Sequence, residues 1–303
     1  MFDIVIIGGG AAGMSAALYA GRSGMKTLVI EALAVGGQMN QTYEIANYPG
    51  VVNSPDGTSL ALLMKSQAAE YGAEFSSETV KEIVDIDAKI KKVVTRKNTY
   101  ETKAIIFATG ANPRKLGVDG EERFRGTGVS YCATCDGAFF KGQETCVVGG
   151  GNTAFEDALY LARFCKKVYL IHRREGFRAE ATMVNAVKNN DKIEFVLNST
   201  VEKINGDTTV SSVVIKNVNT KVVSELNVSG VFVAVGRDAN SALAGKYVRL
   251  DNDGFIVTDR FMQTNIKGVY AAGDVRDTPL RQVITAASDG AVAATTAIHY
   301  IID

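Results

Sequence analysis

The stretch IVIIGGGAAG, residues 4–13, decides the fold of the first half of this chain. Its β-branched start, residues 4–7, predicts a short buried strand, and the pattern of residues 14–22 predicts a helix after the glycines. A glycine-rich turn that joins a strand to a helix is typical of dinucleotide-binding sites. The stretch therefore predicts an α/β unit with a nucleotide at its first turn.

The glycines of this turn have separate physical tasks. Gly8 makes the tight turn, Gly10 lets backbone amides approach a pyrophosphate, and Gly13 allows close packing of the helix on the strand. Because the helix N-terminus faces the anion, Ala11 and Ala12 join these glycines as candidate cofactor-binding residues.

An acidic residue follows at the expected distance. A second strand, residues 27–30, ends at Glu31, which lies 18 residues after Gly13. A carboxylate at this place binds a ribose hydroxyl in dinucleotide sites. We therefore expect this first site to take a dinucleotide whose ribose carries no 2′-phosphate.

The second half repeats the pattern with one change. TCVVGGGNTA, residues 145–154, precedes an expected helix at about residues 155–164 and a strand at 168–171. Where the first copy has its acid, the second has His172, Arg173 and Arg174, with Arg178 four residues beyond. A guanidinium binds phosphate through a planar fork, whereas a carboxylate would repel a 2′-phosphate. The second site is therefore predicted to bind NADPH.

Each half continues with a meander of short strands, at residues 82–102 and 193–228, and then a continuous apolar strand that ends in glycine. In the first meander the basic tract at residues 89–103 alternates with apolar residues, which predicts a solvated hairpin. The predicted class is α/β, with two Rossmann-like, three-layer dinucleotide-binding domains. Polar breaks place residues 1–112 and 241–303 in one domain, and residues 113–240 in a second domain inserted into it.

Composition excludes several classes of protein. The formal net charge is +0 and no run of like charges occurs, so neither nucleic acid nor an anionic membrane is expected as a partner. No basic leader and no apolar run near the roughly 20 residues of a membrane span are present, which favours the cytoplasm. The 303 residues exceed what one core usually holds, and this favours two domains.

The four cysteines are too few for a secreted disulfide framework, and Cys132 and Cys135 form a C-x-x-C pair beside Asp136. Such a pair in a reducing compartment is more often redox-active or metal-binding than structural. No second pair has metal spacing, so no metal is expected. Cys146 in a strand and Cys165 at a helix end are expected to be buried and unreactive.

Taken together, spaced motifs along essentially the whole chain resemble the low-molecular-weight thioredoxin reductases of the bacterial and archaeal type. The motifs are CATCDG at 132–137, GGGNTA at 149–154, HRREGFRAE at 172–180, GGQ at 36–38, NYPG at 47–50, AAGD at 271–274 and RQ at 281–282. The resemblance implies FAD at the first site, which spacing alone does not distinguish from NAD.

The same resemblance assigns further cofactor-binding residues. Those expected near FAD, besides the Gly8 loop and Glu31, are Gly37, Gln38, Asn47, Thr109, Gly110, Gly273, Asp274, Arg281 and Gln282. Those expected near NADPH are Gly151, Asn152 and Thr153 at the pyrophosphate, His172 as a nicotinamide-nucleotide contact, and Arg173, Arg174 and Arg178 at the 2′-phosphate.

The family's chemistry implies roles for the C-x-x-C motif. Electrons pass from NADPH through FAD to a Cys132–Cys135 disulfide, with Cys135 nearest the flavin and Cys132 attacking the disulfide of oxidised thioredoxin. Thiol exchange needs a thiolate attacker and a protonated leaving group, so Asp136 suits a proton donor and acceptor. The alternative for Asp136 is that it only caps a turn.

Two other functions stay open on sequence alone. The partner protein can be another thioredoxin-like or glutaredoxin-like protein, since every motif would be kept. The chain can also be a flavin redox sensor that does not turn over. A ferredoxin–NADP reductase or an oxygen-reducing NADPH oxidase is disfavoured because neither has a use for the C-x-x-C pair. The family suggests a homodimer.

Overall fold

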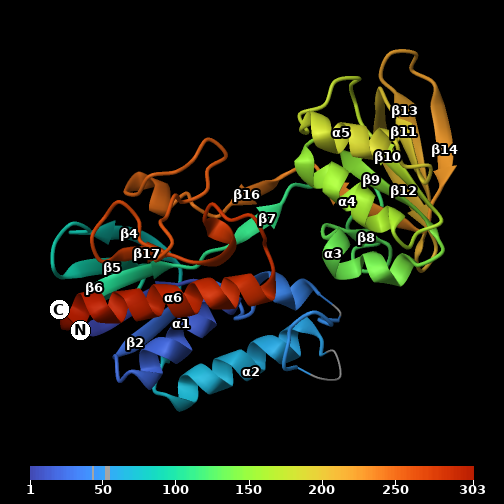
Figure 1. Cartoon of the computed structure of the whole chain (residues 1–303). Helices are drawn as coiled ribbons and strands as arrows, with labels where there is room; N and C mark the ends of the chain where they lie inside the picture. Colours follow the sequence, from blue (N-terminus) through green and yellow to red (C-terminus); the bar gives the residue numbers. More distant parts are fainter. Residues whose placement is uncertain (43, 52–54) are drawn as a thin grey trace. The chain divides into compact units, whose positions relative to one another are not determined.

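The computed structural model describes residues 1–42, 44–51 and 55–303 (Figure 1). The chain divides into two compact units, one made of residues 1–112 and 238–303 and the other of residues 113–237. The second division lies between residues 237 and 238, whereas the sequence analysis places it between 240 and 241. The strands β7 (Ala111–Pro113) and β16 (Arg237–Ala239) pair where the chain passes between the units.

The first unit is built on a seven-stranded sheet in the order β3-β2-β1-β6-β5-β4, with β17 also paired to β6. Its strands are β1 (Phe2–Ile7), β2 (Thr27–Glu31), β3 (Glu74–Ser77), β4 (Val80–Val84), β5 (Lys91–Thr95), β6 (Thr99–Phe107) and β17 (Val269–Ala271). Its helices are α1 (Ala11–Arg22), α2 (Gly57–Glu70) and α6 (Val283–Ile302), with short 3-10 turns η1 (Gly37–Gln41), η3 (Ala244–Lys246) and η4 (Gly273–Val275).

Strand β6 belongs to two parts of this sheet at once. Its first half pairs antiparallel with β5, and its second half, residues 105–107, pairs parallel with β17. The parallel strands carry α1 and α6 on one face, where Ile4, Ile6 and Ile106 are buried. The other face is covered by Ile83 and Val93 of the meander and by residues near η3. The unit therefore has three layers.

Helices α1 and α6 lie side by side in Figure 1, and small residues let their backbones touch. A Cβ on Gly290 of α6 would stand 2.1 Å from the carbonyl oxygen of Ala12. The hydroxyl of Ser15 donates to the carbonyl oxygen of Ala287 at 2.7 Å. The first and last helices of the chain are thus packed as one layer.

The second unit repeats this plan. A parallel sheet in the order β11-β10-β9-β15-β8 is covered by α4 on one face and by an antiparallel sheet, β12-β13-β14, on the other. The strands are β8 (Val129–Ser130), β9 (Glu144–Gly149), β10 (Lys167–Ile171), β11 (Ile193–Val196), β12 (Ser199–Gly206), β13 (Val210–Asn217), β14 (Val223–Asn227) and β15 (Gly230–Ala234). The helices are α3 (Ala133–Asp136), α4 (Asn152–Ala162) and α5 (Ala181–Lys188), with a 3-10 turn η2 (Gly137–Phe140).

The predicted α/β class with parallel, Rossmann-like sheets is confirmed, but both nucleotide-loop helices begin three residues earlier than expected. Helix α1 starts at Ala11 and α4 at Asn152 because Gly10 and Gly151 are the extended N-cap residues. The predicted starts, Met14 and Phe155, lie one turn inside each helix. The first-turn backbone N–H groups therefore belong to the glycine loops themselves.

The prediction of a solvated hairpin is wrong for Lys91. This lysine in β5 has no exposed surface, and its Nζ donates to the carbonyl oxygen of Ala88 at 2.8 Å. Burial lowers the pKa of Lys91, against the opposing charge of Asp87. The alternation of the tract predicted the strand correctly but did not predict that this side chain is buried. Among the described residues, no helix is long and apolar enough to cross a membrane.

Candidate functional site

The first glycine loop packs tightly against the protein backbone at two of its glycines and has free space beside a third. Gly8, at the end of β1, has φ +112°, and a Cβ there would stand 2.3 Å from the carbonyl oxygen of Ala108. A Cβ on Gly13 would stand 1.9 Å from the carbonyl oxygen of Gly8, so α1 packs directly on the turn. A Cβ on Gly10 would meet no atom within 4 Å. The open side of Gly10, beside the first turn of α1, fits an approaching pyrophosphate.

Glu31 is held at the end of β2 by two backbone amides. Its carboxylate accepts hydrogen bonds from Gly9 N at 2.7 Å and Leu33 N at 2.9 Å. A cavity of about 270 Å³ lies beside it, lined among others by Lys65 and Phe75, which the sequence analysis did not identify. Each carboxylate oxygen keeps a further lone pair, so the geometry suits a ribose hydroxyl as an additional donor.

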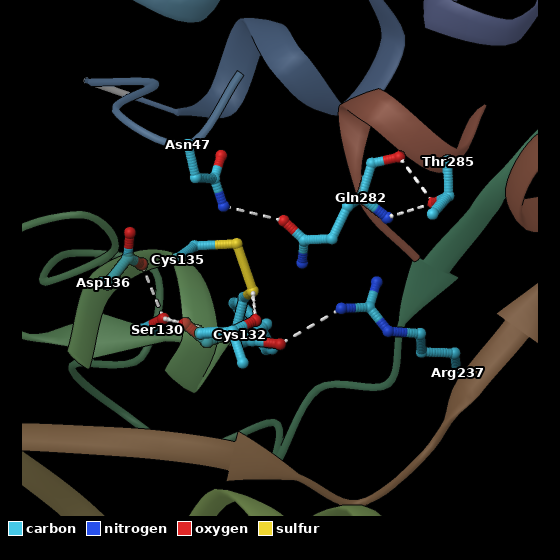
Figure 2. Close-up of a disulfide and its surroundings, with 10 residues drawn as sticks. Asn47, Ser130, Cys132, Cys135, Asp136, Arg237, Gln282 and Thr285 are labelled. Atoms are coloured by element: carbon cyan, nitrogen blue, oxygen red, sulfur yellow. Dashed lines mark hydrogen bonds between the residues drawn. A yellow bond between two sulfur atoms is a disulfide. The ribbon is translucent and has the colours of Figure 1, made fainter. Parts of the chain in front are cut away.

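Three of the other residues expected near FAD hold side-chain amide hydrogen bonds within the same unit. Gln38 Nε2 donates to Asn112 Oδ1 at 2.7 Å, and Asn47 Nδ2 donates to Gln282 Oε1 at 2.9 Å (Figure 2). Gln282 is also the N-cap of α6, where its backbone N–H donates to Thr285 Oγ1 at 3.1 Å. These side-chain amides thus join segments that are far apart in the sequence.

The strand end after β6 is tied to the returning chain. Thr109 Oγ1 donates to the carbonyl oxygen of Asn240 at 2.7 Å, and Asn240 Nδ2 donates to the carbonyl oxygen of Thr109 at 2.9 Å. Gly110 has φ +70° and Gly37, at the start of η1, has φ +55°. A Cβ on Gly110 would meet no atom within 4 Å, which leaves this turn open to a ligand.

A partly buried ion pair shapes the turn at η4. Asp289 Oδ2 accepts hydrogen bonds from Gly273 N and from Arg276 Nη1, each at 3.1 Å. Gly273, with φ +75°, precedes Asp274 in this 3-10 turn, and the Arg281 guanidinium lies 4.2 Å from the centre of the Phe255 ring. Sequence reasoning missed Asp289, whose only signal is an acid on an otherwise apolar helix.

The second glycine loop has the geometry of the first. A Cβ on Gly149 would stand 2.3 Å from the carbonyl oxygen of Ala234, the same clash found at Gly8, while Gly151 is open for 4 Å. Asn152 at the start of α4 accepts a hydrogen bond from Glu180 N at 2.9 Å, and Thr153 is exposed in the same turn. This repetition indicates a second phosphate-binding turn.

His172 lies directly on this loop. A Cβ on Gly150 would stand 2.2 Å from the imidazole ring, and His172 Nε2 lies 3.2 Å from the carbonyl oxygen of Gly176. Burial lowers the pKa of His172, as do the charges of nearby guanidinium groups, despite the opposing effect of the Gly176 contact. These effects favour the neutral form of the ring.

Three exposed arginines, Arg173, Arg174 and Arg178, surround that histidine. The backbone N–H of Arg178 donates to the carbonyl oxygen of Gly150 at 2.9 Å, which joins their segment to the glycine loop. Among the described residues, no carboxylate forms an ion pair with any of the three. Their charges are therefore available to a phosphate group.

The C-x-x-C motif is a disulfide on a tight turn (Figure 2). Cys132 and Cys135 are joined, with their Cα atoms 5.3 Å apart, and Cys132 is the N-cap of the four-residue helix α3. The Thr134 hydroxyl lies 3.4 Å from Cys132 Sγ and is the donor, because a disulfide sulfur carries no hydrogen. Both cysteines are half-buried.

Ser130 links the acid of this motif to its first cysteine. Its hydroxyl donates to Asp136 Oδ2 at 2.6 Å and accepts the backbone N–H of Cys132 at 3.0 Å. Burial raises the pKa of Asp136, while the hydrogen bond from Ser130 lowers it. A carboxyl with a raised pKa exchanges protons closer to neutral pH than an ordinary aspartate does. The sequence analysis missed Ser130.

The two remaining cysteines are free and buried, as predicted. Cys146 lies in β9 and Cys165 follows α4, and burial raises the pKa of both thiols. A raised thiol pKa lowers the thiolate fraction and hence the reactivity.

Comparison with known proteins agrees with this arrangement. Residues 2–290 match the family described as pyridine nucleotide-disulphide oxidoreductase. The chain is 46% identical to a thioredoxin reductase of Peptoclostridium acidaminophilum, over 99% of this chain and 97% of that protein. It is 44% identical to a thioredoxin reductase of Helicobacter pylori, over 99% of both chains.

A crystal structure of thioredoxin reductase from Streptococcus pyogenes has 44% identity and a TM-score of 0.94, covering 100% of this chain and 98% of that chain. FAD and NADPH, the predicted cofactors, are those this family uses. The chain therefore belongs to the pyridine nucleotide-disulphide oxidoreductases and, within them, to the thioredoxin reductases.

Proposed function

We propose that this chain is the NADPH-dependent reductase of an oxidised thioredoxin, with FAD in its first unit, NADPH in its second and the Cys132–Cys135 disulfide as the exit for electrons. The observation that carries the proposal is this disulfide, held beside a partly buried carboxyl in a chain with two open glycine loops. When bound, NADPH would supply a hydride, and FAD would pass its two electrons on to a disulfide.

The two nucleotide sites are distinguished by charge. In the first, Gly10 leaves room for the pyrophosphate and Glu31 accepts a ribose hydroxyl, and its negative charge disfavours a 2′-phosphate. In the second, Gly151 leaves the corresponding room, and Arg173 and Arg174 bind the 2′-phosphate. The assignment of FAD to the first and NADPH to the second rests on this difference.

Thiol–disulfide exchange at the exit needs two cysteines and a proton carrier. After reduction, the Cys132 thiolate attacks one sulfur of the substrate disulfide, and the other substrate sulfur leaves as a thiolate that takes up a proton. The Cys135 thiolate then attacks Cys132 Sγ, which restores the Cys132–Cys135 disulfide and releases the second substrate thiolate. Asp136, with its raised pKa, supplies or accepts the protons of these steps.

The test is turnover of the FAD-loaded enzyme with a panel of thioredoxin-like and glutaredoxin-like disulfide proteins, with NADPH or NADH as donor. We expect sustained NADPH consumption with a thioredoxin. Preference for a glutaredoxin-like protein would show that the proposed partner is wrong. A flavin that is reduced once without turnover would support a redox sensor instead.

A variant of the first cysteine separates the two steps. Cys132→Ser should abolish turnover of the protein disulfide while NADPH still reduces the flavin. Retained thioredoxin reduction by this variant would show that Cys132 is not the attacking thiol.

The assembly and location are also proposals. A homodimer is what the family resemblance suggests, and the exposed Leu62 and Leu63 on α2 support an interface. The cytoplasm is the location expected from the sequence. Light scattering of the FAD-loaded protein should give twice the mass of the 32.3 kDa chain. A monomer at micromolar concentration would contradict this assembly.

A further inference from the structure

Tyr131, the residue before the first redox cysteine, is held at both its side chain and its backbone. Its hydroxyl donates to Glu121 Oε1 at 2.9 Å. Its carbonyl oxygen accepts a hydrogen bond from Arg237 Nη2 at 3.1 Å, and the Arg125 guanidinium lies 5.1 Å from the centre of its ring. These partners are 6 to 106 residues away in sequence, so the contacts fix the segment to the body of the unit.

Glu121 is a rigid anchor for the hydroxyl. The residue is 2% exposed, and besides Tyr131 its carboxylate accepts the backbone N–H groups of Leu116 and Gly117, each at 2.8 Å. A buried carboxylate that accepts three hydrogen bonds has little freedom to move, and breaking one of these bonds costs free energy. Burial raises the pKa of Tyr131, as do the hydrogen bond and charge of Glu121, so the hydroxyl keeps its proton and remains a donor.

The backbone contact bears directly on the cysteine. The carbonyl of Tyr131 and the N–H of Cys132 belong to one planar peptide group. Arg237 holds its oxygen at 3.1 Å, and Ser130 Oγ accepts its N–H at 3.0 Å. A planar group held at both ends has a fixed orientation, and this orientation sets the direction in which the Cys132 side chain leaves the backbone.

The anchors also lie next to both passages of the chain between the units. Leu116 and Gly117 follow β7 closely, and Arg237 is the first residue of β16. The two passages are tied to each other by the hydrogen bond from Arg114 N to the carbonyl oxygen of Gly236, at 2.9 Å. The peptide before Cys132 is therefore held by residues next to the two segments through which the chain enters and leaves the second unit.

We propose that Tyr131 and Arg237 are positioning residues for Cys132, which fix the peptide plane before the attacking thiol and so hold it ready for disulfide exchange. This inference rests on the proposed function, because it assigns the clamp to the exchange step. The clamp consists of Glu121, Tyr131 and Arg237. It acts on the rate of exchange and not on the entry of electrons from NADPH.

The test compares Tyr131→Phe with Tyr169→Phe in the FAD-loaded enzyme. Tyr169 is a matched control, since it is a buried tyrosine of the same unit whose hydroxyl donates to a carboxylate, Glu144 Oε2, at 3.2 Å. Three acceptors are used: thioredoxin, the small disulfide dithiobis(nitrobenzoate), and ferricyanide, which takes electrons without the cysteines. The small disulfide needs Cys132 but no docking surface.

Loss of one hydrogen bond to a charged group should lower kcat for both disulfides about tenfold in Tyr131→Phe. We expect KM and the ferricyanide rate to change less than about twofold, and Tyr169→Phe to match the wild type. Arg237→Met should show the same selective loss and Arg237→Lys should restore part of it, because lysine keeps a donor at similar reach.

Equal kcat in Tyr131→Phe and Tyr169→Phe would overturn the proposal. So would a parallel fall of the ferricyanide rate, since that indicates a general loss of structure; the arginine pair supplies the same comparison if one variant folds poorly. Turnover of the small disulfide without turnover of any thioredoxin would instead contradict the proposed partner. In that case kcat for the small disulfide in the variants still tests the role of the clamp.

Discussion

Replacing both Arg173 and Arg174 with alanine should convert an enzyme selective for NADPH into one that treats NADPH and NADH more nearly alike. The two guanidinium groups are exposed and form no ion pair within the described residues, so no intramolecular partner competes with a 2′-phosphate. The change should act mainly on the phosphate contact, although it also removes two charges that lower the pKa of His172.

The size of the effect follows from that exposure. Hydrogen bonds to charged groups contribute about 1.5–3 kcal/mol when buried, and solvent lowers this to about 1–1.5 kcal/mol for each exposed contact. Two contacts then amount to about 2–3 kcal/mol, or a loss of about 30- to 150-fold in kcat/KM for NADPH. NADH has no 2′-phosphate, so its kcat/KM should change less than about twofold.

The assay is steady-state reduction of a disulfide substrate at fixed ionic strength, with each nucleotide in turn. Arg163→Ala is the matched control, since it removes one exposed positive charge at the opposite end of α4. That end lies about 16 Å away along the helix, about two screening lengths at physiological salt. Equal losses with NADPH and NADH, or an equal loss in Arg163→Ala, would refute a specific contact with the 2′-phosphate.

Three further changes test other parts of the structure. Ser130→Ala should move the Asp136 limb of the pH–rate profile to higher pH, because the lost hydrogen bond favours the charged carboxylate; an unmoved limb would contradict this role. In the FAD-free protein, Gly13→Ala should lower Tm by about 5–10 °C, since its Cβ would clash with backbone. Gly10→Ala, where the space is open, should keep the Tm of the FAD-free protein and weaken FAD binding. Burial raises the pKa of Asp157 to about 7, so the folded state keeps a proton that the unfolded state has lost. The free energy of unfolding therefore falls as pH rises from about 4 to 7. Asp157→Asn should remove up to about 4 kcal/mol of this loss, measured as urea midpoints across that range.

The glycine loops could be read from sequence because their requirements are local. Gly8 and Gly149 both end a strand against a carbonyl oxygen, and only glycine fits there. Glu31 could be found because it follows the next strand at a fixed spacing. The helix starts were placed one turn late, because the helical pattern of side chains begins later than the backbone hydrogen bonds.

Contacts between distant residues left no such signal. Asp289 acts on Gly273 from a different element, and Arg237 reaches Tyr131 across 106 residues. Lys91 shows the same limit within a strand, because alternation predicts which face a residue occupies but not whether a turn covers its amine. These residues are defined by the folded chain, and their types alone are common on surfaces.

The pairing of α1 with α6 has a consequence for the order in which the chain acquires its structure during synthesis. The second unit is contiguous, so it has all its strands once residue 237 has been made. The first unit must wait for Gly290 and its neighbours to cover Ala12 and Ser15 on the helix made first. We therefore expect the inserted unit to become resistant to protease on the ribosome before the unit that surrounds it.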